Sequence, residues 1–168
     1  MPQPPPVIRQ LYWPGLIPQV IAIATLSAVA WLVLPASGLD WAIAIGAVVY
    51  LVACRFMRLV LARDHARGMQ AYRAGRFRDA IAHFEGSCRF FSAHPRLDGW
   101  RSLLFGVASH NPYRVIAIAN MAYCYGQLGE GPKAAELYER VLQEVPDHAV
   151  ARASLNLLRA SVSPPGAA

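Results

Sequence analysis

Two uncharged hydrophobic runs dominate the first third of the chain. The first covers Leu16 to Leu34 and the second covers Trp41 to Cys54, and neither contains Asp, Glu, Lys or Arg. A helix needs about 20 apolar residues to cross a bilayer, so the second run must borrow the apolar residues that follow it. Arg55 and Arg58 permit this because long basic side chains reach back to the interface. The pattern predicts a transmembrane helical hairpin over residues 16–60.

A cleaved signal peptide is the alternative interpretation of the first run, because Arg9 precedes it and a Pro-Ala-Ser-Gly turn follows it. Two features favour the hairpin. The run is longer than the usual signal core of about 7 to 15 residues, and a second apolar run follows at once. Trp13, Trp31 and Trp41 lie near the ends of the runs, where amphipathic rings prefer the headgroup region.

The sequence contains no helix-ending signal that would stop the second helix at the membrane surface. Between Asp40 and Gly75 there is no proline, and the only glycines are Gly46 and Gly68. We therefore expect the second span and the next helix to form one continuous rod, with Asp40 as its N-cap. We expect the first helix to begin around Pro18.

After the hydrophobic runs, one pattern of small and large apolar residues occurs twice. Each copy has a small residue where two helices would cross, a turn, and then a small and a large residue four apart on the second helix. This order predicts two helical hairpins. The matching residues, 54 positions apart, are Gly68, Gly75, Phe77, Ala80 and Phe84 in the first copy and Ala122, Gly129, Gly131, Ala134 and Tyr138 in the second.

The two copies resemble the tetratricopeptide repeat (TPR) family, whose period is about 34 residues, so the 54-residue offset leaves an insert of roughly 20. The second copy follows the family pattern to Pro146. The first has Ser92 where the closing proline belongs, and Pro95 comes three residues later. The order of membrane hairpin, repeat and insert also resembles a group of bacterial membrane-anchored TPR proteins, which implies an architecture and no particular activity.

The resemblance implies an all-α fold, in which an N-terminal two-helix transmembrane hairpin precedes a two-repeat TPR α-solenoid with an inserted short helix and a C-terminal capping helix. Repeat arrays need such an end helix to cover their last apolar face. The expected organisation is an extended or disordered segment over 1–15, the hairpin over 16–60, the repeat domain over 61–160 (first repeat 61–94, insert 95–114, second repeat 115–148, end helix 149–160) and a disordered tail over 161–168.

The insert has two interpretations. Asp98 is expected to cap a short helix whose apolar side chains, from Trp100 to Val107, share one face. This face packs into the repeat domain, which is the preferred interpretation, or it enters the bilayer interface beside the arginines. In the second case the membrane-interface residues are Arg55, Arg58, Trp100, Leu103, Leu104 and Phe105.

Composition and charge agree with an embedded segment. The chain of 168 residues is 55% hydrophobic and only 15% charged, which is too apolar for an ordinary soluble domain. The net charge of +6 lies between residues 55 and 101, where ten arginines accompany four acidic residues. The positive-inside rule then predicts a multi-pass protein of the bacterial inner membrane with both termini and the repeats in the cytoplasm.

The basic stretch also permits nucleic-acid binding as an alternative. Its arginines, however, are spread through a repeat and adjoin a membrane segment, where an anionic leaflet attracts basic residues. We therefore expect the lipid bilayer and a protein or peptide as partners, and no nucleic acid.

Residues for catalysis or metal binding are not apparent. The five histidines lack metal-ligand spacing, and the glycines form no phosphate-binding loop. Cys54, Cys88 and Cys124 form no close pair, so we expect buried free thiols. We expect no enzymatic activity, cofactor or metal.

The TPR resemblance implies a binding groove lined by the first helix of each repeat. Its apolar character suits an extended or helical segment of another protein. The sequence therefore predicts a membrane-anchored scaffold or adaptor, with a constitutive small accessory subunit or assembly factor of a larger membrane complex as the alternative. The expected groove residues are His65, Met69, Tyr72, Ile116, Asn120 and Tyr123.

Overall fold

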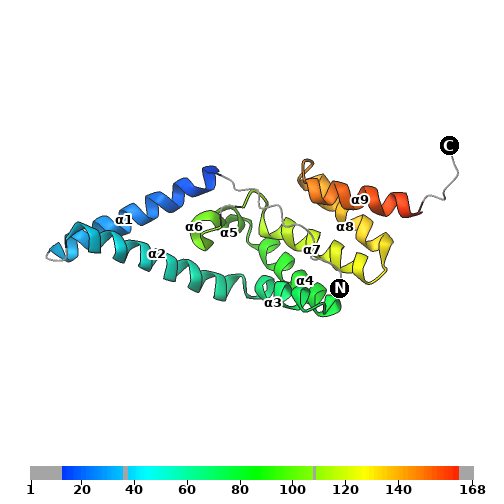
Figure 1. Ribbon diagram of the computed structural model, residues 1–168, viewed down its shortest axis with the longest axis horizontal. Coiled ribbons are helices and arrows are strands. Elements are labelled where there is room, and N and C mark those ends of the chain that lie inside the picture. The colour runs from blue at the N-terminus through cyan, green and yellow to red at the C-terminus, as the bar shows by residue number, and fades with distance from the viewer. Residues whose placement is uncertain (1–12, 36–37, 108, 163–168) are drawn as a thin grey trace. The chain divides into compact units, whose positions relative to one another are not determined.

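The computed structural model describes residues 13–35, 38–107 and 109–162, and its elements in these ranges are all helices (Figure 1). The expected all-α class is confirmed. Contacts divide the chain into two units. The apolar-helix unit comprises the described residues of Met1–Arg58 and Gly99–His110, and the repeat unit those of Leu59–Asp98 and Asn111–Ala168. The expectations for residues 1–12 and 163–168 lie outside the described ranges.

The apolar-helix unit contains a 3₁₀ turn, η1 (Trp13–Leu16), followed by α1 (Ile17–Val33) and α2, which begins at Leu39 and runs to Leu61. The turn η1 replaces the extended chain expected up to residue 15. Helix α1 begins at Ile17, which confirms the expected start around Pro18, and the missing N–H of this proline costs no hydrogen bond in the first turn. Asp40 lies inside the first turn of α2, so the prediction that it is the N-cap was wrong.

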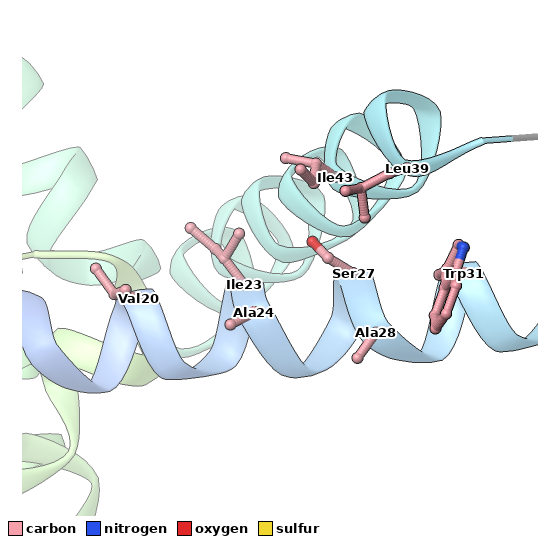
Figure 2. Close-up of a pocket in the computed structure, with 8 residues that line it drawn as sticks. All are labelled: Val20, Ile23, Ala24, Ser27, Ala28, Trp31, Leu39 and Ile43. Carbon is pink, nitrogen blue, oxygen red and sulfur yellow. The ribbon is translucent and has the colours of Figure 1, made fainter.

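Helices α1 and α2 come into close contact where Ser27 meets Gly46. A Cβ atom on Gly46 would lie 2.3 Å from Ser27 Oγ and 2.5 Å from the Ser27 backbone nitrogen. Only glycine permits this approach, because small residues let helix backbones come into contact. Beside this crossing, both helices line a concave apolar site of about 510 Å³, in which Figure 2 shows Ser27 turned toward α2.

Most of the remaining surface of α1 and α2 is exposed and apolar. In the most hydrophobic 18-residue stretch of the helical segment Trp13–Val33, 6% is buried, and in that of Leu39–Leu61, 17%. Both segments are long and apolar enough to cross a membrane. The core helix of a soluble protein would be largely buried, and these helices are not.

The insert contains two short helices, α5 (Pro95–Gly99) and α6 (Arg101–Phe105), where one was expected. The Tyr50 hydroxyl on α2 donates a hydrogen bond to the carbonyl oxygen of Leu103 at 3.0 Å, which satisfies an end of α6 that has no partner within the helix. The Arg101 guanidinium donates to the carbonyls of Ser109 at 2.8 Å and His110 at 2.7 Å. Residues Gly99–His110 belong to the apolar-helix unit, so the preferred interpretation, packing into the repeat domain, was wrong.

The rod expected from α2 onward is interrupted at Ala62. Helix α2 ends at Leu61, Ala62 adopts φ −105° and ψ 23°, and α3 starts at Arg63. No proline or glycine lies at this position, so helix propensity does not explain the break. Ala62 and His65 are both buried, and their packing within the repeat unit replaces the straight continuation that the sequence favours.

The repeat unit is a chain of helices in which each packs on the next: α3 on α4, α4 on α7, α7 on α8, and α8 on α9. Its core contains Ala80, Phe84, Ile118, Ala122 and Tyr138, together with residues from α9. The helix bounds are α3 (Arg63–Arg73), α4 (Phe77–Ala93), α7 (Tyr113–Gln127), α8 (Gly131–Glu144) and α9 (Ala149–Val162).

The two turns that sequence comparison paired have the same geometry. Gly75 and Gly129 both adopt positive φ, at 72° and 77°. After the first turn, the N–H of Arg76 donates to the carbonyl of Ala71 at 3.0 Å, and 54 residues later the N–H of Glu130 donates to that of Tyr125 at 2.9 Å. This six-to-one bond with a left-handed glycine is the Schellman arrangement, which ends a helix by satisfying its last carbonyls. The 54-residue pattern therefore corresponds to two equivalent helix–turn–helix units.

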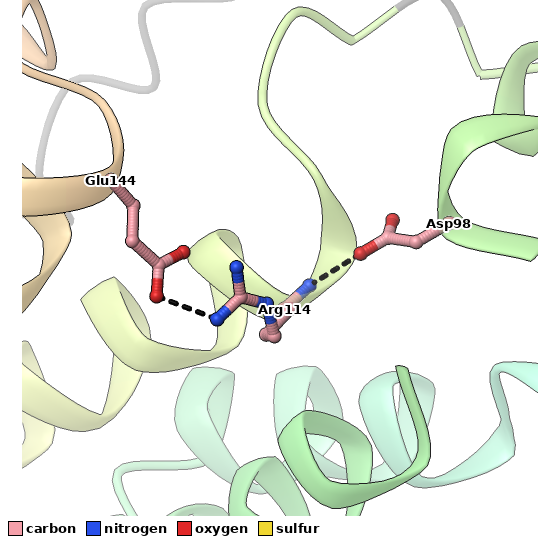
Figure 3. A network of polar contacts seen from close by, with 3 residues as sticks. All are labelled: Asp98, Arg114 and Glu144. Carbon is pink, nitrogen blue, oxygen red and sulfur yellow. Dashed lines mark hydrogen bonds and ion pairs between the residues drawn. The ribbon is translucent and has the colours of Figure 1, made fainter. Parts of the chain in front are cut away.

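The N-terminus of α7 is capped by the side chain of Asp98, which lies in α5 near the start of the insert. Asp98 Oδ1 accepts a hydrogen bond from the N–H of Tyr113 at 2.7 Å, and Oδ2 accepts one from the N–H of Arg114 at 3.2 Å. The Arg114 guanidinium pairs with Glu144 Oε1 at 2.6 Å (Figure 3). Asp98 therefore joins the two ends of the segment that leaves the repeat unit, and does not cap a helix within the insert as expected.

We expect Asp98→Asn to destabilise the repeat unit by about 1–3 kcal/mol, because an amide cannot accept both backbone N–H groups and the position is buried. Hydrogen exchange of the full chain in detergent should show faster exchange of α7. Asp79→Asn removes an exposed carboxylate that is 3.5 Å from Arg76, so it should change exchange little. Equal effects of the two substitutions would contradict the assigned role.

A pair of glycine substitutions tests the helix crossing in the first repeat. A Cβ on Gly68 would lie 2.8 Å from the ring of the fully buried Phe84, so Gly68→Ala should destabilise α3 and α4 by about 1–3 kcal/mol. A Cβ on Gly126 would be 4.0 Å from Ala134 Cβ, so Gly126→Ala should be neutral or stabilising by up to about 1 kcal/mol. Hydrogen exchange measures both, and a stabilising Gly68→Ala would refute the tight crossing.

Candidate functional site

Four of the predicted groove residues meet on one surface of α3 and α7. Asn120 Nδ2 donates a hydrogen bond to Met69 Sδ at 3.4 Å, and the ring centroids of Tyr72 and Tyr123 are 5.1 Å apart. Phe77, at the start of α4, extends this cluster, with its ring 6.3 Å from that of Tyr123. We call these five residues the α3–α7 face, and all five side chains are partly exposed.

The α3–α7 face combines apolar area with a few hydrogen-bonding groups. Aromatic rings contribute large contact areas at low cost in side-chain entropy, and tyrosine adds a polar tip. Burial, and the adjacent Tyr123, raise the pKa of Tyr72, so its hydroxyl stays protonated and able to donate at neutral pH. Ile116, one turn before Asn120 on α7, is also partly exposed. Such a surface can bind the side chains of a peptide through its rings and its backbone through the amide and hydroxyls.

His65, the sixth predicted groove residue, lies in the core instead. It is 9% exposed, Nδ1 is 3.2 Å from Ser87 Oγ, and its ring makes edge contacts with Phe84 and Tyr113. Its burial lowers its pKa from 6.5 to about 4. The prediction that it lines the groove was wrong, because this position of α3 faces α4 and Tyr113, the first residue of α7.

The His65–Ser87 pair is buried in the repeat unit. Ser87 lies within α4 and is 2% exposed. The adjoining cavity of about 280 Å³ is lined by Val60, Leu61, Arg63, Asp64 and Phe90 beside the pair. Buried polar groups need hydrogen-bond partners, so a structural role in the core explains the contact between His65 and Ser87.

The cysteines and histidines provide no metal site in the part of the chain that the structure describes. Cys54, Cys88 and Cys124 are free and buried, as expected from the sequence. Burial raises the pKa of the Cys124 thiol to about 12, which keeps it protonated and unreactive at neutral pH.

The predicted interface residues divide into exposed and buried positions in the apolar-helix unit. Arg55 and Trp100 are exposed, whereas Arg58, Leu103 and Leu104 are partly exposed. Phe105 is completely buried, so its assignment to the membrane interface was wrong. Phe105 lies in the last turn of α6, where Gly106 ends the helix in a left-handed conformation.

A scan against protein-family models and searches among curated proteins and solved structures returned no significant match. Sequence reasoning missed two contributors. Phe77 was expected only as the start of the second helix of the first repeat, although its position after the Gly75 turn also places it beside the first helix. Asp98 acts across 15 residues, a distance for which no local pattern exists.

We expect the repeat unit to lose stability as pH falls from about 6.5 to 4, because the pKa of His65 is lower in the folded than in the unfolded chain. The unfolded state then binds the proton more readily, and the loss should be on the order of 3 kcal/mol, at about 1.4 kcal/mol for each tenfold change in proton affinity. Urea unfolding of the full chain, followed by tyrosine near-ultraviolet circular dichroism, measures it.

His65→Gln should lower stability at neutral pH and remove most of this pH dependence. His94→Gln, at an exposed position, is the matched control and should retain it. A pH dependence unchanged in His65→Gln would contradict the assignment to His65.

Proposed function

We propose that this protein is a membrane-anchored, TPR-type scaffold whose α3–α7 face binds a segment of another protein at the cytoplasmic side of a bacterial inner membrane. The observation that carries the binding role is the partly exposed cluster of Met69, Tyr72, Phe77, Asn120 and Tyr123. An aromatic surface with one amide suits an extended or helical peptide.

Exposure of α1 and α2 supports the membrane anchor. Large apolar side chains such as Val20, Leu32, Leu51 and Val52 are 60% exposed or more. Each buried square ångström of apolar surface is worth roughly 25 cal/mol, so leaving two such helices in water would be strongly unfavourable. A bilayer removes this surface from water without any protein partner.

Equivalence of the two helix–turn–helix units supports the TPR-type arrangement. The paired turns share both the left-handed glycine and the six-to-one hydrogen bond. Ala80 and Ala134 are completely buried, and Phe84 and Tyr138 occupy the large-residue positions four residues later. Helix α9 packs on α8 and supplies the end helix that a short array needs.

Charge supports the cytoplasmic orientation of the repeats and both termini, because the arginines that follow the second span fulfil the positive-inside rule. The proposal assigns the protein no catalytic activity, cofactor, metal or nucleic-acid partner. The buried Ser87 and the protonated Cys124 support this assignment.

One observation favours the second candidate, a constitutive subunit or assembly factor of a membrane complex. The concave site on α1 and α2 is bordered by Val20, Ala24, Ala28 and Ile43, and the buried Ser27 hydroxyl beside it has no hydrogen-bond partner among the described residues (Figure 2). Small residues beside a concave apolar surface are what a third membrane helix uses for close packing.

Site-specific photocrosslinking of the full chain in its native membrane tests the proposal. A benzophenone amino acid in place of Tyr123 should give one discrete protein adduct. The same probe at Tyr125, which is also partly exposed but lies beside Lys133 of α8, is the matched control and should not. Asn120→Ala should reduce the Tyr123 adduct by about tenfold, the effect of losing roughly 1.4 kcal/mol of binding energy.

A probe in place of Ile43 tests the second candidate. A stoichiometric adduct with an integral membrane protein from this position, and none from Tyr123, would replace the scaffold by the subunit. Absence of adducts from both positions would refute both candidates.

A further inference from the structure

We propose that the outer surface of α3 is a docking surface for anionic phospholipid headgroups, an inference that rests on the membrane anchor of the proposed function. The surface is formed by three arginines, Arg63, Arg67 and Arg73, which we call the arginine stripe. All three side chains are exposed.

The stripe occupies the side of α3 that no other helix covers. His65, Gly68 and Ala71 are the buried residues of this helix. At about 100° per residue, Arg63, Arg67 and Arg73 fall within roughly one third of the helix circumference, on the opposite side. Ala66 and Gln70 lie between them and are also exposed. A flat, negatively charged surface can therefore reach all three guanidinium groups together.

No acidic residue neutralises the stripe in the described structure. Asp64, the one carboxylate in α3, is turned toward α4, where its Oδ2 would lie 3.1 Å from a Cβ on Gly86. The ion pairs recorded among the described residues involve other cations: Arg76 with Asp79, Arg114 with Glu144, Lys133 with Glu130, and Arg159 with Glu139. The guanidinium groups of the stripe therefore form none of the ion pairs recorded among the described residues.

Chain connectivity keeps the stripe near the proposed membrane surface. Helix α2 ends at Leu61 and Arg63 begins α3, so at most about 7 Å of chain separates the last residue of the span from the first arginine. For Arg63 this distance is within the Debye length of about 8 Å at physiological ionic strength, so an anionic leaflet attracts this end of the stripe effectively. Arg67 and Arg73 follow about 6 and 15 Å along the helix, so all three reach the headgroups when α3 lies along the bilayer surface. The planar guanidinium group also matches phosphate oxygens in a bidentate geometry.

Docking of the stripe would also orient the partner-binding surface. Tyr72 follows Arg63 by nine residues, which places it about half a turn around α3. With the arginines on the headgroups, Tyr72 and the rest of the α3–α7 face point away from the bilayer and remain accessible to a soluble partner. The lipid contact would therefore act together with the proposed binding role.

A fluorescent probe on the stripe tests the inference. Ala66→Cys, between Arg63 and Arg67, is labelled with an environment-sensitive fluorophore in the full chain, which is reconstituted into phosphatidylcholine vesicles with or without phosphatidylglycerol. The unsubstituted chain controls for labelling of the buried native thiols. We expect a blue shift only in the phosphatidylglycerol vesicles, and reversal of this shift by high salt.

Two variants with the same change in charge distinguish the stripe from total charge. The triple variant Arg63→Gln, Arg67→Gln, Arg73→Gln should lose the shift, whereas Arg78→Gln, Arg89→Gln, Arg140→Gln, at exposed positions on α4 and α8, should keep it. Circular dichroism verifies that both remain folded. An equal loss in the two variants, or no dependence on phosphatidylglycerol, would overturn the inference.

Nucleic acid is the competing ligand class, and a response of the probe to duplex DNA but not to phosphatidylglycerol would favour it and refute the lipid surface. Flotation of the vesicles distinguishes a failure of the membrane anchor from a failure of the arginine stripe to bind lipid. If the chain does not float with the vesicles, the membrane anchor itself fails. If the chain floats and the probe does not respond, the anchor stands and the arginine stripe does not bind lipid.

Discussion

This structure depends on one constraint: two of its helices expose a large apolar surface that the protein itself does not bury. Almost all large hydrophobic side chains that are exposed in the described residues lie on η1, α1 and α2, with Leu34, Trp100, Val150 and Leu157 as the exceptions. The repeat unit, in contrast, has an ordinary core around Phe84, Ile118 and Tyr138. The same chain therefore contains one part that folds by burying its own apolar groups and one part that requires another apolar environment.

These two parts are interleaved along the chain. Residues Gly99–His110 leave the repeat unit and join the apolar helices, where the hydroxyl of Tyr50 binds the end of α6. Hydrogen bonds hold both ends of this segment. Asp98 accepts one from the N-terminus of α7, and Arg101 donates to the carbonyls of Ser109 and His110. Because this segment belongs to the apolar-helix unit and is joined to the repeat unit at both ends, a change in the insert can affect both units.

The sequence predicted features that depend on local pattern. The left-handed turns at Gly75 and Gly129 and the small residues at Ala80 and Ala134 were recognisable because one backbone geometry demands these residue types. The break at Ala62, the burial of His65 and the capping by Asp98 were not predictable, since tertiary packing decides each one and no residue type announces it. The α3–α7 face was predicted in part, because Tyr72 and Tyr123 follow the repeat register whereas His65 does not.

The account is tested most directly by extracting membranes from cells that express the full chain with alkaline carbonate. Two embedded helices should keep the protein in the membrane pellet at the size of the unprocessed chain, since the surface of α1 and α2 is apolar over most of its area. Recovery in the carbonate supernatant, or as a shorter chain that has lost α1, would contradict the claim that both helices are embedded.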